Sequence, residues 1–302
     1  MHVTVVITCY NYGPFLAGCL RSVLAQTYAA FDVVVVDDGS TDDSAEVVSP
    51  FLADPRVRYY YQSNKGQAAA KNVGIVMARG DVVAFLDADD VWMPDKLATQ
   101  MPLFERAEVG VVYSGIGLID QEGQAIPFDG PTGYWQYRRG RVTKWLAFDN
   151  FVPFSSSMVR RRLFDEHGRF DERLRMGIDW DLWLRLSMST EFDFVPARLV
   201  QYRRGHALQM SKDWDGRVAA ADTIFRRFLD AHPDALTSAE LRRVRLYNAC
   251  SRADGYRAAS LNRSTALLMR AVRMAPWSTT PYRGLLRNAR ALVQRVHHLG
   301  HA

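Results

Sequence analysis

The first hundred residues alternate between short apolar runs rich in β-branched residues and stretches in which apolar side chains recur at helical spacing. The apolar runs predict strands at residues 3–8, 33–36, 57–61 and 82–86. The intervening stretches predict helices at residues 16–24, 47–52 and 66–78. Strands that are apolar throughout are typical of parallel sheets buried on both faces. The pattern therefore predicts an α/β fold with a mostly parallel central sheet and flanking helices.

Beyond residue 95 the pattern predicts fewer regular elements. They are a helix at 97–104 that kinks near Pro102, a strand at 109–113, a helix at 179–186, and strands at 192–195 and 199–202. Residues 120–157 lack periodicity and mix Gly, Pro and aromatic residues, which is typical of long functional loops. Aromatic residues of the loop region either stack on a ligand or pin the loop down. They are Tyr134, Trp135, Tyr137 and Trp145.

The charge of the chain changes sign near residue 216. From Arg217 to the end there are 15 Arg, no Lys and five Asp or Glu, whereas the residues before it carry 23 basic and 28 acidic side chains. The pattern from residue 216 onward is almost purely helical. We therefore expect an α/β domain, residues 1–215, and a basic α-helical C-terminal subdomain, residues 216–302. Its arginines either attract anionic lipid headgroups or nucleic acid, or form a solvated face over a core.

Length and composition are those of a globular protein. At 302 residues and 48% hydrophobic content the chain can bury a sizeable core. Its longest apolar runs stop far short of the ~18 to 20 residues of a spanning helix, and its first residues do not resemble a secretory signal. Cys9, Cys19 and Cys250 form no CxxC pair, so we expect free thiols and no structural zinc. We expect a cytoplasmic location, and of the two alternatives for the basic tail, lipid attraction would add peripheral contact with the inner face of the membrane.

Two acidic segments follow predicted strands, where open α/β sheets place their ligands. The second strand runs into the segment DDGSTD, which begins at Asp37 and Asp38. A carboxylate there either accepts a hydrogen bond from a base or ribose, or caps the next helix and shapes the turn. The fourth strand runs into Asp87, Asp89 and Asp90, and such crowded carboxylates suit a hard cation such as Mg²⁺ or Mn²⁺. The alternative for this segment is an acidic helix cap.

Four segments, taken in order, resemble the successive motifs of family two glycosyltransferases. They are VTVVITCYNYGPFLAGCLRSVLAQTY, FDVVVVDDGSTDDS, NKGQAAAKNVGIVMARGDVVAFLDADDVWMPDKL and GIDWDLWLRL. The resemblance covers roughly residues 3–212. It implies the GT-A fold, an inverting transfer of a sugar from a nucleotide-diphosphate donor to an acceptor hydroxyl, and Mn²⁺ or Mg²⁺ as the cofactor.

The resemblance also implies which residues bind the donor and the metal. Thr8 and Tyr10 are implied to line the nucleotide pocket, with the tyrosine ring against the base, and Asp38 to read a base edge. Lys71 stands where the family commonly has an arginine. A lysine keeps the positive charge but lacks the planar guanidinium group that binds phosphate through two hydrogen bonds. Asp87 and Asp89 match the DXD motif, with Asp89 as a direct metal ligand and Ala88 beside the donor. His206 follows a YR-like strand and is implied to contact the metal or diphosphate.

For the catalytic base, the family uses an aspartate in an acidic pair at the start of a helix. The matching residues are Ile178 and Asp179, so the usual glutamate is missing and the aspartate remains. Asp179 is implied to take the proton of the acceptor hydroxyl. Asp181 would point away from Asp179 on a helix, so it is expected to be structural. Trp183 is expected in the core. Trp180 is expected to lie beneath the acceptor as a candidate part of the acceptor site.

Other nucleotide-binding classes lack their signatures in this chain. A sugar nucleotidyltransferase opens with a Gly-rich loop, where this chain has TCYNYGPF, and neither GxGxxG nor GxxxxGK[ST] is present. A glycosyltransferase fold retained as a binding module would have lost the DXD or base aspartates. The expected partners are a nucleotide-diphosphate sugar, with a uracil or thymine base by resemblance, and a glycan or lipid-linked acceptor. No nucleic-acid partner is expected.

Overall fold

The computed structural model describes residues 1–127, 137–205 and 213–299, with side chains up to residue 294. The chain forms two compact units. The first unit comprises residues 1–213 together with 220–228, and the second comprises residues 214–219 and 229–302.

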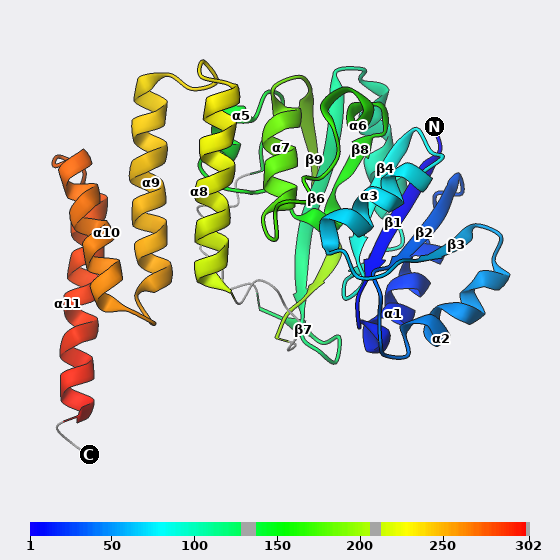
Figure 1. Ribbon diagram of the computed structural model, residues 1–302, viewed down its shortest axis with the longest axis horizontal. Coiled ribbons are helices and arrows are strands. Elements are labelled where there is room, and N and C mark those ends of the chain that lie inside the picture. The colour runs from blue at the N-terminus through cyan, green and yellow to red at the C-terminus, as the bar shows by residue number, and fades with distance from the viewer. Residues whose placement is uncertain (128–136, 206–212, 300–302) are drawn as a thin grey trace. The chain divides into compact units, whose positions relative to one another are not determined.

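A mixed nine-stranded sheet forms the centre of the first unit (Figure 1). Its strands are β1 Val3–Cys9, β2 Phe31–Asp37, β3 Val57–Tyr61, β4 Val82–Asp87, β5 Val91–Trp92, β6 Val109–Ile119, β7 Ala125–Ile126, β8 Met158–Arg160 and β9 Glu191–Arg203. The spatial order is β3-β2-β1-β4-β8-β6-β9-β5, and β7 pairs with β6. The first four strands are parallel neighbours, as the apolar pattern predicts, while β8 runs antiparallel to both β4 and β6.

Helices connect the strands of the first unit. They are α1 Gly13–Leu24, α2 Ser44–Val48, α3 Gln67–Met77, α4 Lys96–Gln100, α5 Thr143–Leu146, α6 Arg162–His167 and α7 Ile178–Ser187. Three short 3₁₀ turns, η1 Ser49–Ala53, η2 Met101–Glu105 and η3 Phe154–Ser156, complete the unit. Each parallel connection thus passes over a face of the sheet, which is how the core is covered.

Strand β2 shows why its apolar run has no polar alternation. Val33 and Val35 pack with α1 in one hydrophobic cluster, whereas Val34 and Val36 pack with Ala70 of α3 in another. Successive side chains point to opposite faces of a strand, so both faces of β2 are buried. Gly74 lets α3 approach the sheet closely, because a Cβ atom there would lie 2.2 Å from the Val6 side chain.

Two local predictions differ from the structure, and two short elements are not predicted by the sequence. The helix predicted at 97–104 ends at Gln100 and continues as the 3₁₀ turn η2, since Pro102 cannot donate a helical hydrogen bond. The strands predicted at 192–195 and 199–202 are one strand, β9, whose pairing with β6 shifts register around Gly115. Strand β8 and helix α6 carry no readable sequence signal, because three and six residues are too short to establish a period.

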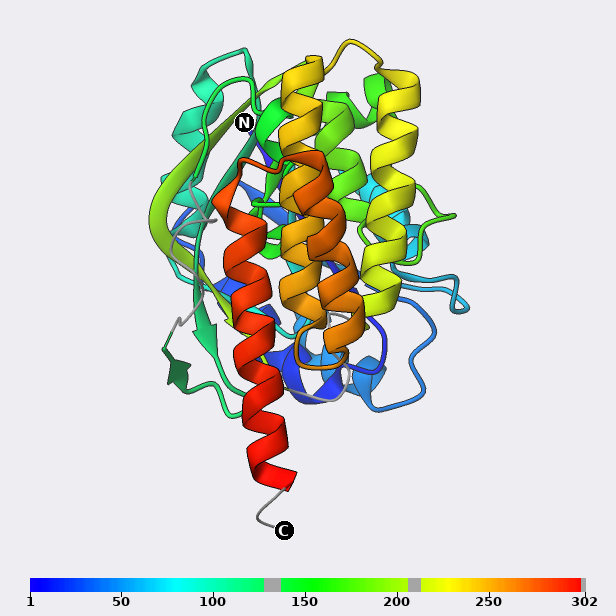
Figure 2. The ribbon, with the colours of Figure 1, turned by 90° about the vertical axis from the view of Figure 1, so that its left-hand side faces the viewer.

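The second unit is helical. Its main elements are α9 Ser238–Tyr256, α10 Leu261–Met274 and α11 Thr279–Leu299, and α8 Trp214–Ala231 contributes residues to both units. Thr237 and Glu240 form a reciprocal capping box at the start of α9. The three helices lie side by side (Figure 2) around a small core that includes Ala253, Leu268 and Ala271. None of the helices in the described residues is long and apolar enough to cross a membrane.

Candidate active site

The carboxyl ends of β1, β2 and β4 bring the predicted donor-site residues to one edge of the sheet. In the strand register Cys9 lies opposite Asp37, and Thr8 lies opposite Asp87. Residues 28 and 79 positions apart in sequence therefore become neighbours at the crevice where open α/β sheets bind ligands. Tyr10 follows β1 directly and is 44% exposed, so its ring is available to a ligand at this edge.

The turn after β2 is held by Asp37, which is almost fully buried. Its carboxylate accepts hydrogen bonds from the Ser40 backbone N–H at 2.7 Å and the Tyr59 hydroxyl at 2.8 Å. Gly39 has φ +82°, and a Cβ atom there would lie 2.7 Å from the Asn64 nitrogen. Asn11 accepts from the Thr41 N–H at 2.7 Å and joins the β1 and β2 loops. Asp37 is thus the structural member of the pair.

Asp38 directly follows β2, and donors of the chain hold its carboxylate beside the start of α3. Its carboxylate accepts from the Gln62 side-chain amide at 2.6 Å, the Lys65 N–H at 2.9 Å and the Gly66 N–H at 2.8 Å. A carboxylate has roughly four lone-pair sites, so this one retains capacity for about one further donor. Its position is set before any ligand arrives.

Lys71 of α3 joins two of the predicted donor-site residues. Its Nζ lies 3.1 Å from Thr8 Oγ1 and 3.0 Å from Asp87 Oδ1, and 4.5 Å from the ring centre of Phe154. The lysine side chain is only 5% exposed, whereas that of Asp87 is 37% exposed. A buried cation therefore stands beneath a carboxylate that remains open to solvent. Ala88 is buried, so contact with a ligand is limited to its backbone.

The loop after β4 is built by residues far away in sequence. Asp90 is fully buried and accepts from Ser155 Oγ at 2.5 Å and from the Arg203 N–H at 2.9 Å. The Arg203 Nε donates to the Asp89 carbonyl at 2.9 Å. Burial, followed by the charges of Asp89 and Asp87, raises the pKa of Asp90 well above its usual value. These hydrogen bonds give Asp90 a structural role and leave Asp87 and Asp89 as the candidate metal ligands.

The residues present fit a divalent cation. No group of three or more His, Cys, Asp or Glu side chains with metal-binding geometry occurs within residues 1–127, 137–205 and 213–294. Mg²⁺ and Mn²⁺ in phosphate-transfer sites nevertheless take one or two carboxylates and draw the other ligands from phosphate and water. Asp87 and Asp89 supply two such carboxylates, and their charges contribute, after burial, to the raised pKa of Asp90. His206 lies outside the described residues.

Asp179 occupies the first turn of α7, which begins after Gly177 at φ +70°. Its Oδ2 accepts a hydrogen bond from the Asn150 side-chain amide at 2.7 Å. Burial raises the pKa of Asp179, hydrogen bonds from Trp180 N–H and Asn150 lower it, and the charge of Asp87 raises it further. The segment that leads into α7 contacts α3, since the Gln67 side-chain amide donates to the Arg175 carbonyl at 3.1 Å. A carboxylate with a raised pKa suits a general base.

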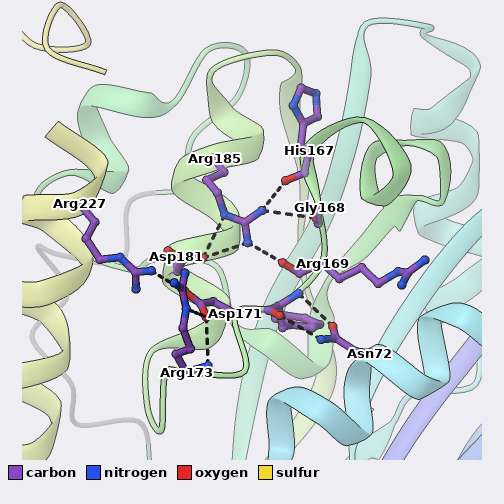
Figure 3. A network of polar contacts seen from close by, with 10 residues as sticks. Asn72, His167, Gly168, Arg169, Asp171, Arg173, Asp181, Arg185 and Arg227 are labelled. Atoms are coloured by element: carbon purple, nitrogen blue, oxygen red, sulfur yellow. Dashed lines mark hydrogen bonds and ion pairs between the residues drawn. The ribbon is translucent and has the colours of Figure 1, made fainter. Parts of the chain in front are cut away.

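A polar network joins α7 to the segment that precedes it (Figure 3). The Arg185 guanidinium donates to Asp181 Oδ2 at 2.9 and 3.0 Å and to the carbonyls of His167 and Arg169 at 2.6 and 2.7 Å. Asp181 is therefore structural, as expected. Asp171 pairs with both Arg173 and Arg227, and these partners lower its pKa. The segment that leads into Asp179 is thereby fixed to α7 and α8.

Replacement of Arg185 is expected to loosen this segment. Arg185→Gln removes charged hydrogen bonds and leaves backbone carbonyls unpaired, so the free energy of unfolding should fall by about 2–4 kcal/mol. Urea denaturation measures this change. Arg162→Gln is the matched control, since it breaks only the exposed pair with Glu166 and should cost about 0–0.5 kcal/mol. Equal losses in both variants would mean that the Arg185 network contributes no more than a surface ion pair.

Aromatic residues proposed for the acceptor region take different places. Trp180 is buried, donates a hydrogen bond to the Leu146 carbonyl at 2.7 Å and stacks on Phe225. It is therefore a packing residue and does not line an open acceptor site, contrary to the prediction. Trp183 is fully buried, as expected. Tyr137 stacks on Phe194 with ring centres 4.6 Å apart, while Trp145 is 37% exposed. Tyr134 and Trp135 lie outside the described residues.

Solved structures with the same architecture identify the class of fold. S. aureus TarS, residues 1–349, aligns with TM-score 0.65 and 18% identity over 91% of this chain and 81% of that chain. The mannosyltransferase PcManGT of Pyrobaculum calidifontis aligns with TM-score 0.61 and 19% identity over 99% of this chain and 87% of that chain. The fold is the GT-A fold of glycosyltransferases, with added C-terminal helices.

Residues 4–168 match the family model described as Glycosyl transferase family 2, which covers more than half of the chain. The chain belongs to glycosyl transferase family 2.

Among curated relatives, glycosyltransferase GlyG of Streptococcus pneumoniae serotype 4 is 39% identical over 230 residues, 70% of this chain and 74% of the relative. An uncharacterized glycosyltransferase of Nostoc sp. is 41% identical over 128 residues, 42% of this chain and 40% of the relative. Chondroitin synthase of Escherichia coli is 32% identical over 197 residues, 64% of this chain and 27% of the relative. The match thus spans less than half the length of the Nostoc and E. coli relatives.

Proposed function

We propose that this glycosyltransferase is inverting and metal-dependent, and that it transfers a sugar from a UDP- or dTDP-sugar to an acceptor hydroxyl. The observation that carries the proposal is the contact of α3 with the segment that leads into α7 and the candidate base, because Lys71 of the same helix binds Asp87 at the candidate metal edge. The site would then have a diphosphate-binding side and a proton-accepting side, as a displacement at an anomeric carbon requires.

The donor side uses residues at the ends of β1 and β2. Tyr10 would stack on the base, and Asp38 would accept a base N–H with its remaining lone-pair capacity. Thr8 and Lys71 would lie along the diphosphate. Solved neighbours contain different nucleotides, since TarS was solved with UDP and with UDP-GlcNAc and PcManGT with GDP-Man and Mn²⁺. The preference for uracil or thymine is therefore part of the proposal.

Asp87 and Asp89 would hold Mn²⁺ or Mg²⁺, with His206 as a further candidate contact. A bound divalent ion supplies positive charge that stabilises the departing diphosphate. The chain's own contribution is to fix the Asp87 carboxylate through Lys71 and the Asp89 backbone carbonyl through Arg203. The fully buried Asp90 would keep the loop in shape without touching the ion.

Asp179 would accept the proton of the acceptor hydroxyl as its oxygen attacks the anomeric carbon. The bond from that carbon to the diphosphate breaks on the opposite face, so the configuration inverts and the nucleoside diphosphate leaves with the electron pair. Asn150 holds the Asp179 carboxylate by donating its side-chain amide N–H to Oδ2.

Asn150→Ala is expected to shift the pH dependence of transfer. The Asn150 amide stabilises the charged form of Asp179, so its removal raises the pKa of Asp179. A base must be deprotonated to act, and the acidic limb of the kcat/KM profile should therefore move to higher pH. A pH series with wild type and variant measures the shift. An unchanged acidic limb would mean that Asp179 is not the titrating base.

The acceptor class is proposed as a surface polysaccharide or glycolipid precursor. The E. coli relative is a chondroitin synthase, which supports a polysaccharide acceptor by analogy alone. Buried free thiols at Cys9, Cys19 and Cys250 are consistent with a reducing compartment and thus with the cytoplasmic side of a membrane. We also propose that the basic tail brings the enzyme into peripheral contact with that membrane.

The test is product analysis by NMR after incubation with candidate UDP- and dTDP-sugars, Mn²⁺ and glycan or glycolipid acceptors. The proposal expects a new glycosidic bond whose anomeric configuration is opposite to that of the donor, and no product when a chelator replaces Mn²⁺. Retained configuration would overturn the inverting mechanism. Full activity in chelator would overturn the metal role, and donor binding without turnover would favour a binding module.

A further inference from the structure

The last 48 residues of the chain carry charge of one sign only. Residues 255–302 contain eight Arg and no Lys, Asp or Glu. The last acidic residue, Asp254, already pairs with Arg257 and Arg287. Arg283 and Arg290 are exposed and make no ion pair within the described part of the second unit. The exposed arginines therefore leave positive charge that an anionic partner would neutralise.

Helix α11 presents an exposed apolar stripe. Tyr282, Leu286, Ala289 and Val293 follow the spacing i, i+4, i+7 and i+11, which places them on one face of a helix. All four are exposed, Leu286 at 62% and Val293 at 56%. Single exposed apolar residues are ordinary, but a continuous stripe over three turns is not.

Packing within the second unit uses the other side of α11. Gly284 sits against Leu268 of α10, where a Cβ atom would lie 2.5 Å from a leucine methyl. Asn288 is buried and exchanges hydrogen bonds of 2.9 and 3.2 Å with Ser264. The apolar stripe therefore makes no contribution to the small core of α9, α10 and α11.

Arginines flank the stripe on one side. Arg283, Arg287 and Arg290 lie about 80° to 140° around the helix from Tyr282 and its partners, at 100° per residue. Trp277 stands just before α11 and is 74% exposed, and the Tyr282 hydroxyl holds this turn through a 3.0 Å hydrogen bond to the Pro276 carbonyl. Apolar residues in a stripe, arginine beside them and an aromatic residue at one end are the features of an interfacial helix.

We infer that the face of α11 formed by Tyr282, Leu286, Ala289 and Val293, with Arg283 and Arg290, docks on an anionic lipid surface. The apolar stripe enters the boundary between headgroups and acyl chains. The arginines extend their alkyl stems beside it and place their guanidinium groups on lipid phosphates. The inference rests on the proposed function in one respect, because docking serves the enzyme when the acceptor is in the membrane.

Charge selects the lipid surface over a second copy of the chain. A symmetric pair through this face would bring like arginine rows together, with no acidic residue after Asp254 to offset them. An anionic membrane matches both the sign of the charge and the apolar stripe. A bare polyanion would match only the charge.

The experiment is sedimentation of the full chain with vesicles of phosphatidylglycerol and phosphatidylcholine, and with vesicles of phosphatidylcholine alone. Wild type should partition onto the anionic vesicles and lose binding at high salt. Leu286→Asp should reduce partitioning at least about tenfold, because it puts a charge in the apolar stripe. Leu52→Asp is the matched control, since Leu52 is an exposed leucine of the first unit, and it should bind as wild type does.

Two double variants measure the contribution of the arginines to binding separately from that of the apolar stripe. Arg283→Glu with Arg290→Glu should abolish the preference for anionic vesicles, whereas Arg21→Glu with Arg79→Glu, two exposed arginines of the first unit, should retain most of it. Equal binding to both vesicle types, or equal losses in Leu286→Asp and Leu52→Asp, would overturn the docking face.

A dimer that dissociates in Leu286→Asp, seen by analytical ultracentrifugation without vesicles, would assign the face to self-association and overturn the lipid assignment. Transfer to a soluble acceptor should be unchanged in Leu286→Asp. Failure of docking and failure of the proposed chemistry are therefore measured in separate assays.

Discussion

Asp179→Asn is expected to lower the rate of sugar transfer by about 10²–10⁴-fold, while the donor binds as tightly as in wild type. Asparagine has nearly the same shape and still meets the Asn150 side chain, but it cannot take the proton of the acceptor hydroxyl. The donor residues at the ends of β1, β2 and β4 are untouched. The measurement pairs single-turnover transfer rates with donor affinity in Mn²⁺.

Asp181→Asn is the matched control for that variant, because it makes the same chemical change two residues further along α7. Asp181 is bonded to Arg185 and belongs to the anchoring network, so its variant should lose stability but retain transfer to within about tenfold. Wild-type turnover in Asp179→Asn would place the base elsewhere. A greater rate loss in Asp181→Asn than in Asp179→Asn would reverse the two roles.

Asp89→Ala is expected to weaken donor binding at least about 100-fold in Mn²⁺ and to have little effect in chelator. The reason is that the diphosphate and the carboxylate would be linked only through the cation. Isothermal titration with the nucleoside diphosphate, with and without Mn²⁺, measures both affinities. Asp95→Ala removes an exposed acidic residue just beyond the loop and should leave both values unchanged. Similar losses with and without metal would indicate a direct or structural role for Asp89.

Lys71 shows how far a motif can define a site before a structure is available. The sequence places a lysine where the family commonly has arginine, and this departure is readable from the chain alone. Its contacts are not, because they depend on α3 packing against β1 and β4. In the structure the ammonium group bridges Thr8 and Asp87 and offsets part of the negative charge of the acidic loop. A ligand diphosphate would compete with Asp87 for this ammonium group.

Local patterns predicted the first four strands and the acidic edge well, for identifiable reasons. Strands buried on both faces must be apolar at every position, and their carboxyl ends in a parallel sheet must share one edge. Both rules act within a short window of sequence. The positions of Asp38, Asp87 and Asp89 follow from them, whereas their roles in binding stay predictions.

Residues that hold the site in place left no such signal. Asn150 meets Asp179 across 29 residues, Ser155 meets Asp90 across 65, and Arg203 meets Asp90 across 113. No periodicity or spacing rule relates positions so far apart. Asn150 also falls in the irregular 120–157 region, and Arg203 ends a strand whose length was underestimated. Packing of the whole unit selects these partners, so only the structure reveals them.

The most direct test of a metal-dependent sugar-nucleotide site is a thermal-shift screen of UDP-, dTDP- and GDP-sugars, each with Mn²⁺ and with chelator. A ligand that binds only the native state stabilises it by about 2.7 kcal/mol at 100 times its dissociation constant. The proposed function predicts a rise in Tm that requires both Mn²⁺ and a UDP- or dTDP-sugar. The absence of any rise with every donor, or a rise of equal size in chelator, would contradict it.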